Sequence, residues 1–138
     1  MPIAPLYGHD PLRARLRGAA RRGTLPSSLL IHGPRGIGKQ RLALWLGQLL
    51  LCESGLSDAA PCGTCRSCRY ATELGHPDLQ WYFPRPRSKD TEPTLEEVKD
   101  DFIDALRERL ETNGIYAPPS GLEGIFIRTV HLVVQQAG

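Results

Sequence analysis

Two groups of residues in this 138-residue chain have the types and spacing that chemistry requires. The first is the glycine-rich stretch 33–40, which follows a short apolar run and precedes a helical pattern. Glycines allow a tight turn, so that consecutive backbone N–H groups and the start of the next helix point at one anion. A lysine adds a positive charge for the outer phosphates of a nucleotide. The candidate nucleotide-binding residues are Gly33, Pro34, Arg35, Gly36, Ile37, Gly38, Lys39 and Gln40.

One position departs from the phosphate-binding pattern. The motif places Ser or Thr after the lysine, because that hydroxyl is a Mg²⁺ ligand. This chain has Gln40, whose longer side chain carries its oxygen to the wrong place for octahedral Mg²⁺ coordination. No Asp-Glu pair follows any apolar run, although a hydrolysing site needs an acidic residue there. The loop is expected to hold phosphate poorly or without hydrolysing it, and the use of ATP and Mg²⁺ stays open.

The second group is four cysteines with the spacing Cys52-x9-Cys62-x2-Cys65-x2-Cys68. Two overlapping C-x-x-C pairs and a fourth cysteine at a helix end suit four thiolates around one tetrahedral Zn²⁺. Such a site has no open position for water, so the expected zinc is structural and no residue is predicted to be catalytic. An iron–sulfur cluster is the alternative, and unliganded buried thiols are the weaker interpretation. His76 is expected to serve a turn, because four sulfurs already complete the tetrahedron.

Composition limits the class of protein. The chain is 41% hydrophobic and 23% charged, which is ordinary for one globular domain. A net charge of +2 gives no global basic field, and the arginines of the first 22 residues are interpreted as a solvated helix face. No secretory segment is present, and no apolar run approaches the ~20 residues that span a membrane. The expected compartment is the cytoplasm, where cysteines bind metal more often than they form disulfides.

Hydrophobic spacing predicts the elements that carry the glycine loop and the cysteines. A helix is expected over Asp10–Arg22, with Asp10 as its N-cap. A strand at Ser28–His32 should lead into the loop, and a helix over Arg41–Leu51 should follow it. A second strand is expected at Leu79–Phe83. Strand, loop and helix in this order predict an α/β nucleotide-binding module.

The C-terminal part reads as helical. Thr94 and Glu97 form a capping box, which opens a helix that should end at Asn113-Gly114. Residues 125–137 fit either a helix or a strand, and a helix is favoured. The residues that fit one helical stripe there are Phe126, Val130, Val133 or Val134, and Ala137.

Three features together resemble the N-terminal module of the clamp-loader subunits of bacterial DNA polymerase III, which are AAA+ proteins. They are the glycine loop 33–39, the four-cysteine insertion directly after its helix, and His76-Pro-Asp78. The segments 7–10 and 25–32 resemble the family's approach to the loop, and the resemblance covers residues 6 to 83. Within the family the delta-prime type is the closer match, because it has His-Pro-Asp and tolerates a degraded position such as Gln40.

The resemblance implies an incomplete P-loop (AAA+) domain over residues 1–138, with a zinc module at 52–68 and a helical insertion at about 94–137. It implies a chain that continues beyond Gly138. The implied function is DNA replication, as a stator-like, non-catalytic subunit of the polymerase complex with weak or no ATPase. The implied partners are the other clamp-loader subunits and, through them, the sliding clamp and primed DNA, but no membrane. A hydrolysing gamma/tau-type motor remains the alternative, and a zinc-ribbon nucleic-acid-binding module is the weaker one.

Overall fold

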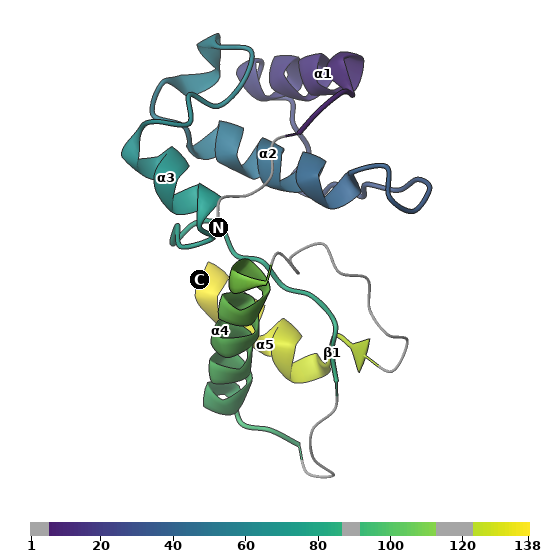
Figure 1. Ribbon diagram of the computed structural model, residues 1–138, viewed down its shortest axis with the longest axis vertical. Helices are drawn as coiled ribbons and strands as arrows, with labels where there is room; N and C mark the ends of the chain where they lie inside the picture. The colour runs from purple at the N-terminus through teal and green to yellow at the C-terminus, as the bar shows by residue number, and fades with distance from the viewer. Residues whose placement is uncertain (1–5, 87–91, 113–122) are drawn as a thin grey trace. The chain divides into compact units, whose positions relative to one another are not determined.

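The computed structural model describes residues 6–86, 92–112 and 123–138. The chain divides into two compact units, residues 2–80 and residues 81–138, and each is described here by itself (Figure 1). None of the helices in the described residues combines the length and apolar character that crossing a membrane requires.

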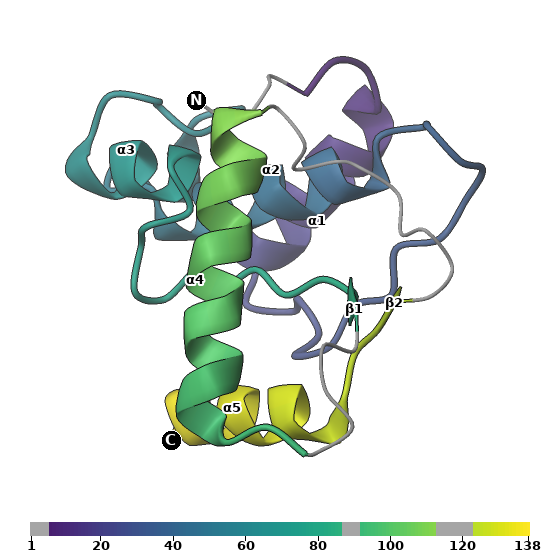
Figure 2. The ribbon, with the colours of Figure 1, turned by 60° about the horizontal axis from the view of Figure 1, so that its bottom comes forward.

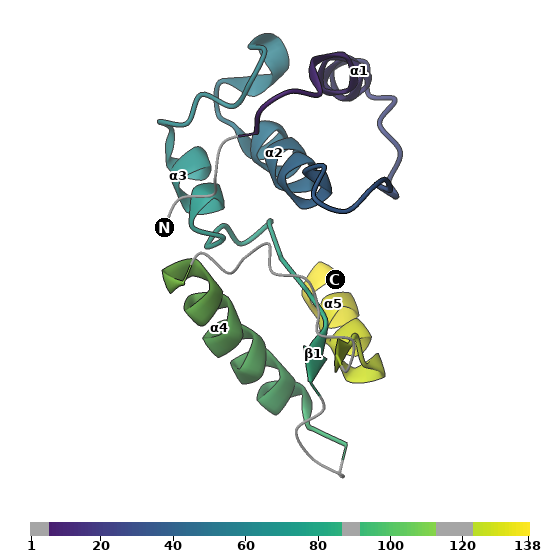
Figure 3. The same ribbon diagram turned by 45° about the vertical axis from the view of Figure 1, so that its right-hand side comes forward.

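The unit of residues 2–80 is built around one helix. Its elements are α1 (Asp10–Arg21), α2 (Lys39–Leu51), the 3-10 turn η1 (Gly55–Ser57) and α3 (Arg66–Thr72). Figures 1 and 3 show α2 with α1 on one side and α3 on the other, and α2 contacts both. The core is a buried cluster on α2, made of Leu42, Trp45, Leu46 and Leu49. This cluster packs against Leu6, Leu16, Ile31 and Leu56.

The two predicted helices of this unit are confirmed, with one correction at the start of α1. His9, with φ 58°, is the N-cap, and Asp10 is already the first helical residue. Asp10 forms an ion pair with Arg13, one turn further along α1. Gly23, with φ 67°, lies just beyond the end of the helix, as a glycine stop signal predicts.

The two predicted strands are not formed. Residues 28–32 and 79–83 have no strand assignment, and the strands in the described ranges are β1 (Arg85–Pro86) and β2 (Glu123–Gly124). These pair antiparallel, with Arg85 opposite Gly124. A strand forms only with a hydrogen-bonded neighbour, which the described residues do not provide for 28–32, and Leu30 there is 87% exposed. The described part of the chain is therefore mainly helical.

The unit of residues 81–138 packs α4 (Leu95–Glu111) against α5 (Ile127–Ala137), as Figure 2 shows. The predicted capping box is confirmed: the Glu97 N–H donates to Thr94 Oγ1 at 3.2 Å, and the Thr94 N–H donates to Glu97 Oε2 at 2.9 Å. The predicted helix end at 113–114 lies outside the described residues. The core consists of Phe83, Val98, Phe102, Ala105 and Leu132.

The predicted helix near the C-terminus is confirmed as α5, but its predicted stripe is not buried. Thr129 and Leu132 are the residues of α5 that are buried, at 3% and 4% exposure. The stripe residues Phe126, Val130, Val133, Val134 and Ala137 are all exposed. Apart from Leu132, the apolar residues of α5 gather on one face, and the structure buries the other side of the helix through Thr129 and Leu132. The contact with α4 decides which face is used.

Candidate functional site: the cysteine cluster and the glycine loop

The four cysteines come from the end of α2, the start of α3 and the segment between these helices. Cys52 is the C-cap of α2, Cys65 is the N-cap of α3, and Cys68 lies in the first turn of α3. Cys62 precedes Gly63, whose φ of 72° reverses the chain toward α3. The turn and the two helix ends therefore bring together thiols that lie up to 16 positions apart in the sequence.

The sulfur atoms have the separation of a four-thiolate site. All four lie within 4.8 Å of one another, so this group could hold a metal ion. The distance between Cys62 Sγ and Cys68 Sγ is 3.9 Å. Four sulfurs at about 2.3 Å from a tetrahedral Zn²⁺ lie about 3.8 Å from each other, so the donor set fits such an ion.

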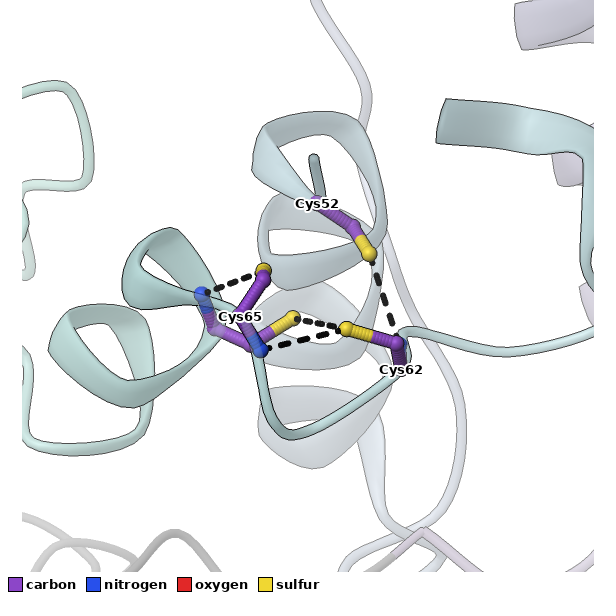
Figure 4. A group of neighbouring side chains, drawn as sticks. Cys52, Cys62 and Cys65 are labelled. Atoms are coloured by element: carbon purple, nitrogen blue, oxygen red, sulfur yellow. Dashed lines mark hydrogen bonds between the residues drawn. The ribbon is translucent and has the colours of Figure 1, made fainter. Parts of the chain in front are cut away.

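Backbone N–H groups donate to three of the sulfurs, in a pattern that repeats along the chain. The N–H of Cys62 donates to Cys52 Sγ at 3.4 Å, that of Cys65 to Cys62 Sγ at 3.3 Å, and that of Cys68 to Cys65 Sγ at 3.3 Å. Figure 4 draws these bonds around Cys52, Cys62 and Cys65. Hydrogen bonds to a sulfur favour its charged form, and the thiolate is the form that binds metal.

The thiols differ in their protonation. The backbone N–H of Cys65, followed by that of Thr64, lowers the pKa of Cys62 to about 5. Burial raises the pKa of Cys68 to about 12, since that sulfur is enclosed and lacks a compensating charge. A bound cation would supply that charge, which is the electrostatic role of a metal among coordinating thiols.

Side chains beside the cluster join α2 to α3. Gln48 Nε2 donates to the Cys68 carbonyl at 3.3 Å and to Thr72 Oγ1 at 3.0 Å. Glu53 Oε1 accepts from the backbone N–H and the hydroxyl of Ser67, at 3.1 and 3.2 Å. Sequence reasoning missed Gln48 and Glu53, although Gln48 lies one helical turn before Cys52 and therefore on the same face of α2.

His76 serves a turn, as expected from the sequence. Its Nδ1 accepts from the Asp78 N–H at 3.1 Å, and its carbonyl accepts from the Leu79 N–H at 3.0 Å. The four-sulfur group does not include this imidazole.

The glycine loop leads directly into α2. Gly36 and Gly38 have φ values of 81° and 96°, which only glycine adopts readily, and α2 begins at Lys39. Lys39 Nζ turns back over the loop and donates to the carbonyls of Gly33 and Pro34, at 2.9 and 2.7 Å. An ammonium group has three N–H donors, so these two bonds leave one for an anion.

Some residues of the glycine loop make contacts within the loop, and others are exposed to solvent. Lys39 contacts the first two loop carbonyls, while Arg35 and Gln40 are exposed. The first turn of α2 contains no acidic residue. The loop therefore presents one lysine and backbone N–H groups in a glycine turn, without the hydroxyl that the motif places after the lysine.

Comparison with protein families extends this description. A family model described as "DNA polymerase III, delta subunit" matches residues 8–120. The chain belongs to this family. The match spans the glycine loop, the four cysteines and α4, so the predicted resemblance to DNA polymerase III subunits is confirmed.

Curated relatives carry related names. The DNA polymerase III subunit tau of Escherichia coli K12 is 32% identical over 99 residues, which cover 70% of this chain and 15% of that protein. The subunit delta' of Bacillus subtilis 168 is 30% identical over 100 residues, covering 72% of this chain and 27% of that protein. The subunit delta' of Pseudomonas aeruginosa is 32% identical over 71 residues, covering 51% and 21%. The chain thus spans 15% to 27% of the length of these relatives. No solved structure gives a significant match.

Proposed function

We propose that this chain is part of a subunit of the sliding-clamp loader of DNA polymerase III, and that it acts in DNA replication as a non-hydrolysing, stator-like subunit. Its working place is the cytoplasm, within a hetero-oligomer of clamp-loader subunits that reaches the sliding clamp and primed DNA. Family membership supports the clamp-loader assignment. The single observation that carries the non-hydrolysing role is Gln40, which stands where a hydrolysing loop has its Mg²⁺ ligand.

The glycine loop and α2 are the phosphate-binding part of a P-loop domain of the AAA+ type. The bonds from Lys39 to two loop carbonyls support this assignment, because they hold the ammonium over the loop where phosphate would lie. An exposed glutamine in the first turn of α2 leaves Mg²⁺ without its hydroxyl ligand. The loop therefore holds a nucleotide through backbone N–H groups and Lys39, and it does not hydrolyse the nucleotide.

The metal of the cysteine cluster is one structural Zn²⁺ per chain. The sulfur separations and the repeated N–H to sulfur bonds support a closed four-thiolate site. Such a site has no ligand position for water, so the ion stabilises the turn between α2 and α3 and takes no part in catalysis.

A hydrolysing motor of the tau type is the second candidate. Its support is the similarity to the Escherichia coli tau subunit, which at 32% identity is as high as the similarity to the delta' subunits. The two roles differ in one measurable property, the turnover of ATP.

ATP turnover by the purified chain is expected to equal that of its Lys39→Ala variant. The reason is that Gln40 lacks the hydroxyl that would bind Mg²⁺. In addition, no Asp-Glu pair follows an apolar run of this sequence to supply the acidic residue that hydrolysis requires. The measurement is phosphate release at saturating Mg²⁺ and ATP. Turnover that the wild-type chain shows and Lys39→Ala abolishes would establish the motor role and contradict the stator role.

A Gln40→Thr variant is the matched control, since it restores the hydroxyl without changing the loop. Its affinity for ADP should rise by about tenfold when Mg²⁺ is added, whereas the wild-type affinity should change little. Equal Mg²⁺ dependence in the two proteins would show that Gln40 is not what weakens metal coordination.

A further inference from the structure

His9 makes a contact with the glycine loop that the motif does not explain. Its Nε2 lies 2.7 Å from the carbonyl oxygen of Ile37, although the two residues are 28 positions apart. A Cβ atom added at Gly38 would lie 3.8 Å from the same nitrogen, so the imidazole lies beside Gly38 as well. Since a carbonyl only accepts, Nε2 carries the proton and donates.

The backbone at His9 has an unusual conformation that accompanies the contact with the loop. Gly8 and His9 have φ values of 74° and 58°, so two consecutive residues adopt the left-handed conformation. His9 is the N-cap of α1, but its side chain makes no capping bond to α1. Its carbonyl accepts from the Arg13 N–H at 2.9 Å, so the backbone starts the helix while the imidazole is directed to the loop.

The contact fixes one peptide of the loop. In a planar trans peptide the carbonyl of one residue and the N–H of the next point in opposite directions. The described residues contain no cis peptide bond, so holding the Ile37 carbonyl against His9 directs the Gly38 N–H to the opposite side. Gly38 directly precedes Lys39, the first residue of α2.

We infer that His9 is a positioning residue for nucleotide binding: it orients the Ile37–Gly38 peptide so that the Gly38 N–H is presented to a phosphate group. This inference rests on the proposed phosphate-binding role of the loop. It also links the start of α1 to the start of α2, because the same residue caps one helix and holds the loop that begins the other.

Two substitutions at His9 separate positioning from folding. In His9→Gln the amide nitrogen occupies about the place of Nε2 and can still donate to the Ile37 carbonyl. In His9→Asn the amide is one carbon shorter and cannot reach. Asn adopts the left-handed conformation and is a good N-cap, so it should keep α1 intact. Thermal unfolding should therefore show the same stability for Asn and Gln variants.

The affinity for ADP, measured by calorimetry on the whole chain, is expected to fall about tenfold in His9→Asn and to stay within about threefold of wild type in His9→Gln. Wild-type affinity in His9→Asn would overturn the inference, and so would an equal loss in both variants. Lys39→Ala serves as the reference for loss of the site.

A second measurement keeps the two proposals distinguishable. If the wild-type chain does not bind ADP, the proposed phosphate-binding role of the loop fails. The contact with the peptide is then read from the amide ¹⁵N chemical shift of Gly38 by NMR, because a hydrogen bond to the Ile37 carbonyl polarises the same peptide group. The Gly38 shift should change in His9→Asn and return toward the wild-type value in His9→Gln. An unchanged shift in His9→Asn would overturn the inference on its own.

Discussion

Replacing Cys65 by Ser is expected to release the metal ion and to disorder the segment from Cys52 to Cys68. Cys65 supplies one of four sulfurs, and its Sγ also accepts the Cys68 N–H that starts α3. Structural Zn²⁺ contributes about 10–16 kcal/mol in small zinc-binding peptides, so its loss should exceed the effect of any single side-chain truncation in this chain. The buried core on α2 should keep the rest of the unit folded.

The measurement is the zinc content of the purified protein, with the unfolding midpoint determined in parallel. The wild-type chain should carry one zinc, and Cys65→Ser should carry none after a brief challenge with chelator. Ser67→Ala is the matched control, because Ser67 lies in the same turn but contacts Glu53 and no sulfur. Iron in the wild-type protein, or zinc retained by Cys65→Ser, would contradict the assignment.

Replacing Phe102 by Ala is expected to lower the free energy of unfolding of residues 81–138 by about 3–5 kcal/mol. Phe102 is 8% exposed and belongs to the buried cluster of this unit, which includes residues of α4 and α5. Its ring meets those of Tyr82 and Phe83 edge to face, with centroid distances of 5.1 and 5.4 Å. Truncation removes both aromatic contacts and leaves a cavity that a unit of this size cannot refill.

Urea denaturation followed by circular dichroism measures this effect. Ile103→Ala is the matched control, since Ile103 is the next residue of α4 but is 45% exposed. Its substitution should cost less than about 1 kcal/mol. Similar losses in the two variants would mean that the cluster around Phe102 is not the core of this unit.

Features that depend on local sequence could be predicted. The capping box of Thr94 and Glu97 is complete within four residues, so the start of α4 follows from the chain itself. The C-x-x-C spacing likewise confines Cys62, Cys65 and Cys68 to one short stretch of chain. Cys52 joins them from the end of α2, and the four sulfurs lie within 4.8 Å of one another, as expected for the predicted four-cysteine group.

Features that depend on distant partners could not be predicted. Leu30 lies in a segment with the composition of a buried strand, but burial needs neighbouring strands that the described residues do not supply. The contact with α4 determines which face of α5 is buried, and the hydrophobic periodicity of α5 alone does not contain that information. α3 was not predicted, because its seven residues are too few for a periodic signal and its start is set by the sulfur of Cys65. The contact of His9 with Ile37 joins residues that no motif pairs.

The central claim is that this chain works inside the clamp loader of DNA polymerase III, and co-purification tests it most directly. The gene product would be tagged at its own locus, recovered from growing cells, and its associated proteins identified by mass spectrometry. The claim predicts that a tau-type DNA polymerase III subunit is recovered in a fixed proportion to the tagged protein. Recovery of the tagged protein without any DNA polymerase III subunit would contradict it.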